Sequence, residues 1–156
     1  MDVKEVFSYM PFTNLVGIDI TAVDEGYAEG TVEMREELSS VPGGQVAHGG
    51  VTYSLADTVG GAAVISLTHD VAPTVDMRMD YLAPATDDLV AEAEVIRHGG
   101  SVAVASIDVY DADDHHVATA RGVYKTGGDS EGTPWLRGGS DDSENDENEN
   151  GDVETF

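Results

Sequence analysis

The sequence predicts an α+β domain in which a curled antiparallel sheet wraps around one long central helix. Two observations predict this fold. Strand-like segments lie on both sides of a long apolar run from about Gly49 to Leu67, two before it and four after it. The run has no clearly polar face, and a helix that is apolar nearly all round must be buried on most sides. Strands gathered around one such helix favour an antiparallel sheet that covers it.

The segment before the apolar run predicts one short helix, two strands and a loop. Residues 2–10 are amphipathic and are followed by Pro11, which is typical of a short helix that ends there. Alternating apolar and polar residues predict the two strands, and a turn sequence between them predicts a hairpin. In order, these elements are the strand Leu15–Val23, the turn Asp24-Glu25-Gly26, the strand Tyr27–Arg35 and the loop Glu36–Ala47.

Small residues in the middle of the central helix indicate close packing. Gly60, Gly61, Ala62 and Ala63 follow one another and remove side-chain bulk from the helix. Each glycine costs about 1 kcal/mol of helix propensity, so the gain is expected to be close approach of the sheet.

The chain after Pro73 predicts four strands joined in meander order. The segment from Val102 to Asp111 alternates so that Ala103, Ala105, Ile107 and Val109 share one face, which we expect to face the core. The four predicted strands are Thr74–Leu82, Leu89–His98, Val102–Asp111 and Val117–Lys125.

Charge divides the chain into a body, residues 1–127, and a tail, residues 128–156. The net charge is −24; the tail holds ten acidic residues against one arginine, which leaves −15 on the body. The tail has no apolar pattern, so we expect it to be disordered. An acidic body with only two lysines is typical of a cytoplasmic protein from a halophile that accumulates salt, because molar salt screens the repulsion between carboxylates.

Several classes of function are disfavoured by composition. The chain has no cysteine, which excludes thiol catalysis and zinc–thiolate sites. It has no basic stripe for nucleic acid and no apolar run of the roughly 18 residues that a membrane span needs. His115 and His116 are adjacent and point to opposite faces of a strand, so they predict no shared metal ion. We therefore expect no metal, no cofactor, no nucleic-acid partner and no membrane partner.

The start of the central helix carries the chemistry. The sequence Ala47-His48-Gly49-Gly50 is a glycine turn that opens the helix, and Asp57 lies two turns further on. A helix N-terminus presents unsatisfied N–H groups and partial positive charge, which can polarise a carbonyl oxygen. A lone carboxylate on an apolar helix is costly unless it serves a purpose. Together they indicate a site that handles an acyl carbonyl.

Two motifs resemble one family. His48-Gly49-Gly50 followed by Asp57 and a small-residue helix, and then the segment Thr74–Ala85 with its Tyr81-Leu82-Ala83-Pro84-Ala85 ending, are similar to the hotdog-fold acyl-CoA thioesterases of the phenylacetate-pathway (PaaI-like) type. The resemblance covers about residues 10–126. It implies a hotdog fold, an acyl-CoA substrate, no cofactor, and a homodimer or homotetramer with active sites at the subunit interface.

The resemblance also implies residue roles. The Gly49 N–H would polarise the thioester carbonyl, Asp57 of the partner subunit would be general base or nucleophile, and Thr74 would help to hold the attacking water. For substrate binding, the expected residues are His48, which would brace the turn, together with Gly50, Gln45, Tyr53 and Arg97. We expect the acyl group to lie near Tyr53, Val64 and Met77 or Met79.

Two departures from the family pattern keep alternatives open. The family's usual Asn, six residues before the histidine, is Pro42 here, so Gln45 or Ser40 would have to replace it. The turn Arg97-His98-Gly99-Gly100 keeps only the first of two basic residues that contact CoA phosphates in the family. The alternative functions are a non-catalytic acyl-CoA-binding hotdog protein and a hotdog enoyl-CoA hydratase.

Overall fold

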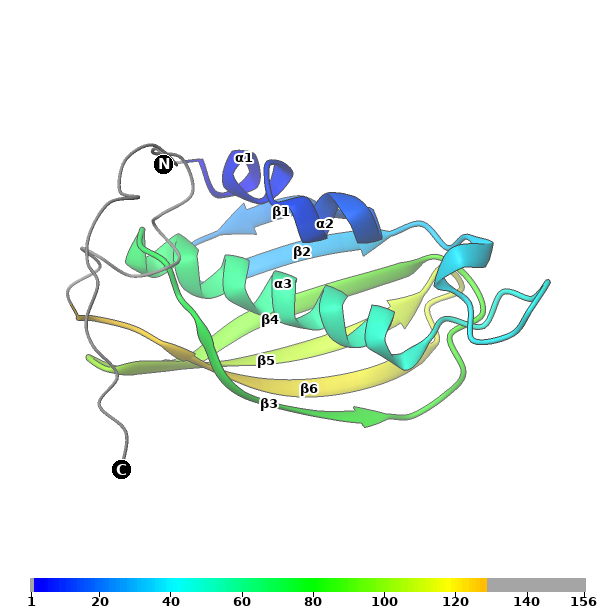
Figure 1. Ribbon diagram of the computed structural model, residues 1–156. Coiled ribbons are helices and arrows are strands. Elements are labelled where there is room, and N and C mark those ends of the chain that lie inside the picture. The colour runs from blue at the N-terminus through cyan, green and yellow to red at the C-terminus, as the bar shows by residue number, and fades with distance from the viewer. Residues whose placement is uncertain (1, 129–156) are drawn as a thin grey trace, which may run out of the picture.

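The computed structural model describes residues 2–128, which form a six-stranded antiparallel sheet curled around one long helix (Figure 1). The central helix and the curled sheet are therefore as predicted. The predicted tail lies outside the described residues except for Gly128. The helices are α1 (Val3–Ser8), α2 (Pro11–Val16), the 3-10 turn η1 (Glu36–Leu38) and α3 (Gly49–Thr68). The strands are β1 (Ile18–Asp24), β2 (Tyr27–Val32), β3 (Thr74–Tyr81), β4 (Leu89–His98), β5 (Val102–Asp111) and β6 (His116–Lys125).

The strand order corrects the predicted meander. The order is β1-β2-β4-β5-β6-β3, so β4, β5 and β6 form a meander while β3 pairs with β6 at the far edge. The reason is that α3 crosses the inner face of the sheet and delivers the chain to the edge opposite the β1–β2 hairpin (Figure 1). The connection from β3 to β4 then returns the chain to the middle of the sheet.

The N-terminal segment also differs from the prediction. It forms two helices instead of one, because Pro11 opens α2 at a position where a missing N–H costs nothing. Leu15 and Val16 belong to α2, so β1 begins only at Ile18. Leu15 is 72% exposed, which shows that the apolar alternation there did not mark a core-facing strand. Strand β2 ends at Val32 and does not reach Arg35.

The core lies between α3 and the inner face of the sheet. The predicted inner residues of β5, Ala103, Ala105, Ile107 and Val109, are all fully buried. Helix α3 buries residues on most of its circumference, as its apolar composition predicts. Among residues 2–128, no helix is long and apolar enough to cross a membrane.

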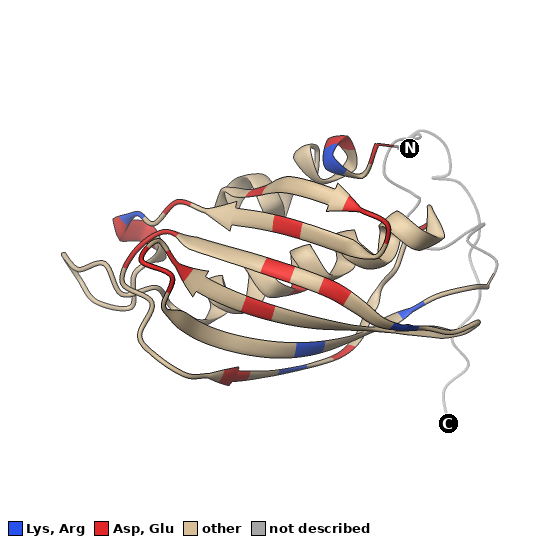
Figure 2. Cartoon of the chain, turned by 180° about the vertical axis from the view of Figure 1, so that it is seen from behind, with Lys and Arg blue, Asp and Glu red and all other residues tan. Residues whose placement is uncertain are grey.

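Acidic residues line the outer face of the sheet. In Figure 2 they form bands that lie side by side on β2, β4 and β5. The pairing places Glu29 opposite Glu92, and Glu92 opposite Asp108. Like charges directly opposite each other on neighbouring strands destabilise a sheet. His116 also contacts this face, with its Nε2 2.8 Å from the Asp108 carboxylate.

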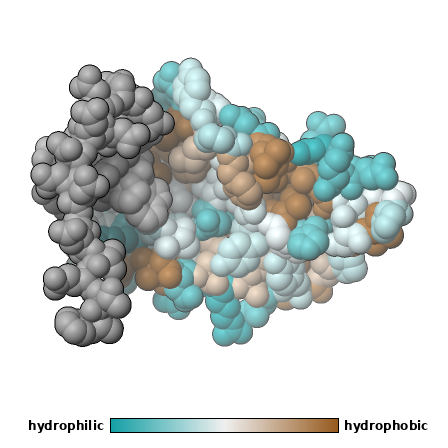
Figure 3. Space-filling view, viewed as in Figure 1, coloured by the Kyte–Doolittle hydropathy of each residue, from teal (hydrophilic) through white to brown (hydrophobic). Residues whose placement is uncertain are grey.

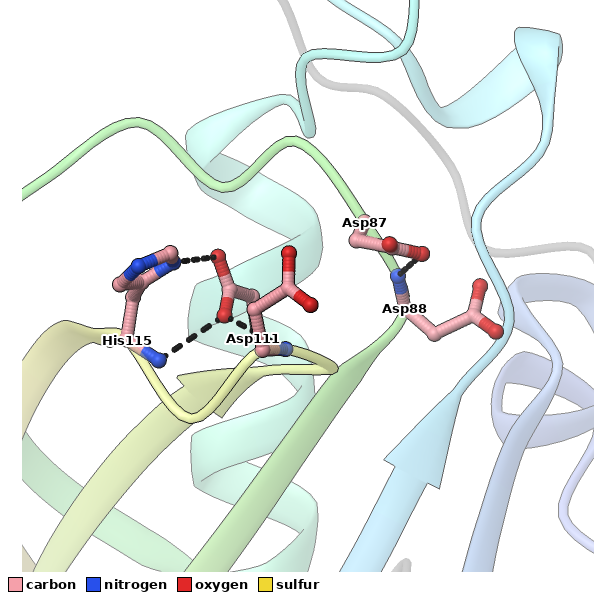
Figure 4. Close-up of polar contacts among 5 residues, drawn as sticks. Asp87, Asp88, Asp111 and His115 are labelled. Carbon is pink, nitrogen blue, oxygen red and sulfur yellow. Dashed lines mark hydrogen bonds and ion pairs between the residues drawn. The ribbon is translucent and has the colours of Figure 1, made fainter.

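The turn between β5 and β6 is organised by one buried carboxylate (Figure 4). Asp111 is 4% exposed and accepts hydrogen bonds from the N–H groups of Asp113 and His115. Its second oxygen lies 3.0 Å from His115 Nδ1. Burial raises the pKa of Asp111, but these hydrogen bonds outweigh it and leave the pKa below its ordinary value. Asp111 therefore stabilises the turn as a carboxylate.

Candidate functional site

Helix α3 begins with an N–H group that is free to bind a ligand. His48 is the N-cap residue, and its Nδ1 accepts a hydrogen bond of 2.9 Å from the Gly50 N–H. Within residues 2–128, the Gly49 N–H has no acceptor. The helix dipole adds partial positive charge at this end. A carbonyl oxygen that becomes negative during a reaction would be stabilised there.

Asp57 lies two turns further along α3 and faces β3. Thr74 Oγ1, in the first residue of β3, donates a hydrogen bond of 2.7 Å to Asp57 Oδ1. Burial raises the pKa of the Asp57 carboxyl above its ordinary value, and the hydrogen bond from Thr74 lowers it in part. A partly desolvated carboxylate with a raised pKa is a better base than an exposed one.

Tyr124 is a site residue that sequence reasoning missed. It is fully buried in β6, and its hydroxyl donates to the backbone carbonyl of Asp57 at 3.3 Å. A Cβ added at Gly60 or at Gly122 would overlap the Tyr124 hydroxyl, so the two glycines form the slot that holds it. In the sequence, the adjacent Gly60 and Gly61 indicate close packing, but nothing links them to Tyr124, which lies 64 positions after Gly60.

Three hydrogen bonds join β3 to one stripe of α3. The Tyr81 hydroxyl donates to the Gly49 carbonyl at 2.7 Å, and the Tyr53 hydroxyl donates to the Met77 carbonyl at 3.2 Å. The third bond is the one from Thr74 to Asp57. Gly49, Tyr53 and Asp57 are four residues apart, so they lie above one another on a single face of the helix. The stripe and the strand run antiparallel.

The same spacing separates the two reactive groups within one chain. Eight residues of helix span about 12 Å, so the Gly49 N–H and the Asp57 carboxylate of one chain are too far apart to act on the same carbonyl group. A site that uses both groups needs them from two copies of the chain.

A groove with both apolar and polar walls, the polar ones including Glu37 and Ser54, lies beside the first turn of α3. It has a volume of about 360 Å³ and includes His48 and Gly50, the residues on either side of Gly49. Its apolar walls come from Phe12, Val16, Leu38 and Val51. Figure 3 shows hydrophobic residues gathered over α2 and the adjoining end of α3. A groove of this size and character suits a small apolar group.

The structure separates some of the predicted residues from this cluster. Val64 is fully buried in the core and cannot line an acyl pocket, which corrects that prediction. Gln45 is exposed in the loop before α3. Arg97 is exposed near the end of β4. Across the sheet it is in line with Asp76 of β3, but three strand spacings, or about 14 Å, separate the two residues. Tyr53 is 37% exposed beside β3.

The histidines of the β5–β6 hairpin have separate partners. His115 contacts Asp111, and His116 contacts Asp108 and stacks on Tyr110. In the part of the chain that the structure describes, no three His, Asp or Glu side chains come together as a metal-binding group.

Comparisons with known proteins point in one direction. A family model described as the thioesterase superfamily matches residues 44–118. A Halobacterium salinarum protein named "Putative esterase" is 36% identical, over 72% of this chain and 82% of its own length. The acyl-coenzyme A thioesterase PaaI of Escherichia coli is 34% identical, over 69% of this chain and 76% of its own length. The solved structure of E. coli PaaI covers 80% of this chain and 89% of its own, with a TM-score of 0.71 and 31% identity.

Proposed function

Because the chain belongs to the thioesterase superfamily and has its hotdog fold, we propose that it hydrolyses acyl-CoA thioesters. The observation that carries this proposal is the pair of groups on one stripe of α3. The Gly49 N–H is free at the helix N-terminus, and Asp57 is a partly desolvated carboxylate oriented by Thr74. Attack on a thioester carbonyl requires both a donor that stabilises the carbonyl oxygen and a base or nucleophile, and these two groups would supply them.

In the proposed reaction, the Gly49 N–H of one subunit binds the thioester oxygen and stabilises the negative charge that forms on it. Asp57 of the partner subunit takes a proton from a water molecule as that water attacks the carbonyl carbon. The C–S bond then breaks, and the proton passes to the leaving CoA thiolate. In the alternative route, the same carboxylate attacks the carbonyl carbon and expels the CoA thiolate, and water then hydrolyses the resulting anhydride. Thr74 fixes the carboxylate in either route.

The proposal of a site shared between two subunits is supported by the 12 Å interval along one helix. With two copies, each Asp57 is paired with the Gly49 N–H of the other copy, so a dimer has two equivalent sites. We assign the groove beside Gly50 to the acyl group, since its apolar walls are Phe12, Val16, Leu38 and Val51. His48 holds the turn by accepting a hydrogen bond from the Gly50 N–H. Tyr53 borders the site, where its hydroxyl donates to the Met77 carbonyl.

Two further contacts belong to the proposal. We assign Gln45, in the loop that leads into α3, to the thioester carbonyl or its attacking water. Pro42, which stands at the position of the family's usual Asn, has no side-chain donor for this role. Arg97 is assigned to the CoA phosphates. Repulsion among the acidic residues of the body also leads us to propose that the protein works in molar salt in the cytoplasm.

The test is hydrolysis of a panel of acyl-CoA thioesters in about molar KCl, followed by release of free thiol. Wild type and Asp57→Asn are compared, with folding checked by circular dichroism. We expect turnover by wild type and a loss of at least about a hundredfold in the variant. Tight CoA binding without turnover would favour a binding protein. Hydration of an enoyl-CoA without thiol release would favour a hydratase.

A further inference from the structure

The first turn of α3 opens on two consecutive glycines, Gly49 and Gly50. Apart from proline, glycine is the residue least favourable in a helix, and the first N–H groups of a helix have no partner within it. Helix ends fray, and glycine adds backbone freedom to such an end. The proposed oxyanion donor, the Gly49 N–H, therefore lies where the helix is least ordered by its own hydrogen bonds. Its direction has to be fixed by contacts from outside the helix.

Two side chains hold the peptide unit between Gly49 and Gly50 at both of its polar atoms. Its N–H, on Gly50, donates to His48 Nδ1 at 2.9 Å, and its carbonyl, on Gly49, accepts from the Tyr81 hydroxyl at 2.7 Å. A peptide unit is planar, so contacts at its N–H and at its carbonyl fix its orientation. The peptide unit that carries the Gly49 N–H adjoins it at the Gly49 Cα. The orientation of one unit therefore restricts the other.

Each glycine leaves room for the side chain that holds it. A Cβ added at Gly49 would lie 3.3 Å from the Tyr81 hydroxyl oxygen and 3.3 Å from the ring carbon that bears it. A Cβ added at Gly50 would lie 3.0 Å from His48 Nδ1. Both distances are shorter than ordinary van der Waals contact. The glycines that weaken the first turn are thus the residues that let its two supporting side chains approach.

Tyr81 connects the start of the helix to the sheet. It is the last residue of β3 and pairs with Ala118 of β6, and the N–H of the next residue, Leu82, donates to the Val117 carbonyl at 2.9 Å. Burial, and to a smaller extent Tyr53, raises the pKa of the Tyr81 phenol above its ordinary value. The phenol is therefore protonated at neutral pH and can donate to the Gly49 carbonyl.

We propose that Tyr81 is a positioning residue for the oxyanion donor: its hydroxyl, held by the sheet, fixes the first turn of α3 and with it the direction of the Gly49 N–H. This inference rests on the proposed function, because it states how the donor of that site is held. Negative charge forms on the thioester oxygen only in the transition state, so a misdirected donor lowers kcat and leaves KM almost unchanged. His48 alone would leave the carbonyl side of the peptide unit free.

The first experiment is steady-state kinetics of Tyr81→Phe in the full chain, which deletes the hydroxyl and keeps the ring. We expect kcat to fall at least about tenfold while KM stays within about twofold of wild type. The matched control is Ser66→Ala. The Ser66 Oγ, about 25 Å further along α3 than Gly49, accepts a hydrogen bond of 2.9 Å from the Gly26 N–H, so the control also deletes a bond between α3 and the sheet. An unchanged kcat in Tyr81→Phe, or equal losses of kcat in both variants, would overturn the proposal.

The second experiment follows hydrogen exchange of the Gly50 N–H by NMR, with the buried Val59 amide of α3 as the internal reference. We expect exchange at Gly50 to be at least about tenfold faster in Tyr81→Phe and unchanged in Ser66→Ala, with Val59 unchanged in both. Exchange at Gly50 that does not accelerate, or accelerates only together with Val59, would overturn the positioning role. This readout is independent of catalysis. Faster exchange in a protein that hydrolyses no thioester would leave the role of Tyr81 in the first turn standing and reject the proposed function.

Discussion

Thr74 and Tyr124 lie directly opposite each other on β3 and β6, and the hydroxyl groups of both donate to Asp57. Thr74 bonds the carboxylate, and Tyr124 bonds the main-chain carbonyl of the same residue. One cross-strand pair therefore holds both the side chain and the backbone of Asp57. The sheet, and not only the helix, determines where this carboxylate points.

Tyr124→Phe removes the backbone contact and keeps the packed ring. Because this hydrogen bond is long, at 3.3 Å, we expect the free energy of unfolding to fall by about 1 kcal/mol. We expect kcat to fall about fivefold with KM unchanged. Steady-state kinetics and a thermal melt measure the two effects. A variant that melts earlier but keeps the wild-type kcat would show that Tyr124 supports the fold alone.

Gly49→Pro removes the proposed oxyanion donor. Proline is accepted at the first helical position, and His48, with ψ of 136°, already has the extended backbone that a following proline requires. We expect kcat to fall by about a hundredfold. Gly49→Ala is the matched control, because it adds a similar Cβ beside the Tyr81 ring and keeps the N–H. Equal losses in both variants would assign the effect to crowding.

The raised pKa of Asp57 predicts the acid limb of the pH–rate profile. Burial favours the protonated form, so kcat/KM is expected to rise with pH through a pKa above the ordinary value of 3.8. Thr74→Val deletes the hydrogen bond that lowers this pKa, and it is expected to move the limb to higher pH. A limb that does not move would indicate that another group controls it.

Asp57→Asn is expected to stabilise the fold while it abolishes activity. When folding raises the pKa of an acid, the free energy of unfolding falls as the pH rises from the pKa of the unfolded state through the pKa of the folded state. Replacing it removes this loss, and the gain at pH 7 is expected to be below about 1 kcal/mol because the group is partly solvated. Urea titrations of both proteins at pH 4 and pH 7 measure it, and a stability difference that does not grow with pH would contradict it.

Mixed dimers test whether each site draws on two chains. A chain with Asp57→Asn and a chain with Gly49→Pro are each expected to be inactive as homodimers. Their heterodimer contains one site with both wild-type groups and one with neither. A statistical mixture should therefore recover about a quarter of the wild-type rate. Mixing without recovery, once subunit exchange is demonstrated, would place the site within one chain.

The sequence predicted the elements better than their connections. The apolar run at α3 and the alternation in β5 depend on local burial, so they can be read one segment at a time. The place of β3 beside β6 depends on where a 20-residue helix releases the chain, which no single segment records. Leu15 shows a related limit of prediction from sequence. An exposed apolar residue in a short helix can produce the same apolar–polar alternation as a strand.

The candidate site divides in the same way. His48, Gly49 and Asp57 lie on one continuous stretch, where a turn and a helical spacing fix their arrangement. Tyr124 acts through the β3–β6 pairing and through two glycines, so its role appears only in three dimensions. Val64 was misplaced because the sequence does not say which side of an all-apolar helix the core covers.

The eight-residue interval from Gly49 to Asp57 acts as a fixed length. One residue inserted between them would turn Asp57 by about 100° around the helix axis and shift it by about 1.5 Å. The carboxylate would leave Thr74, and in a symmetric pair both sites would be lost in a single genetic event. Surface residues of this protein can drift one at a time, but even a whole added turn of helix would move Asp57 about 5.4 Å away from Thr74, so the length of this segment cannot change.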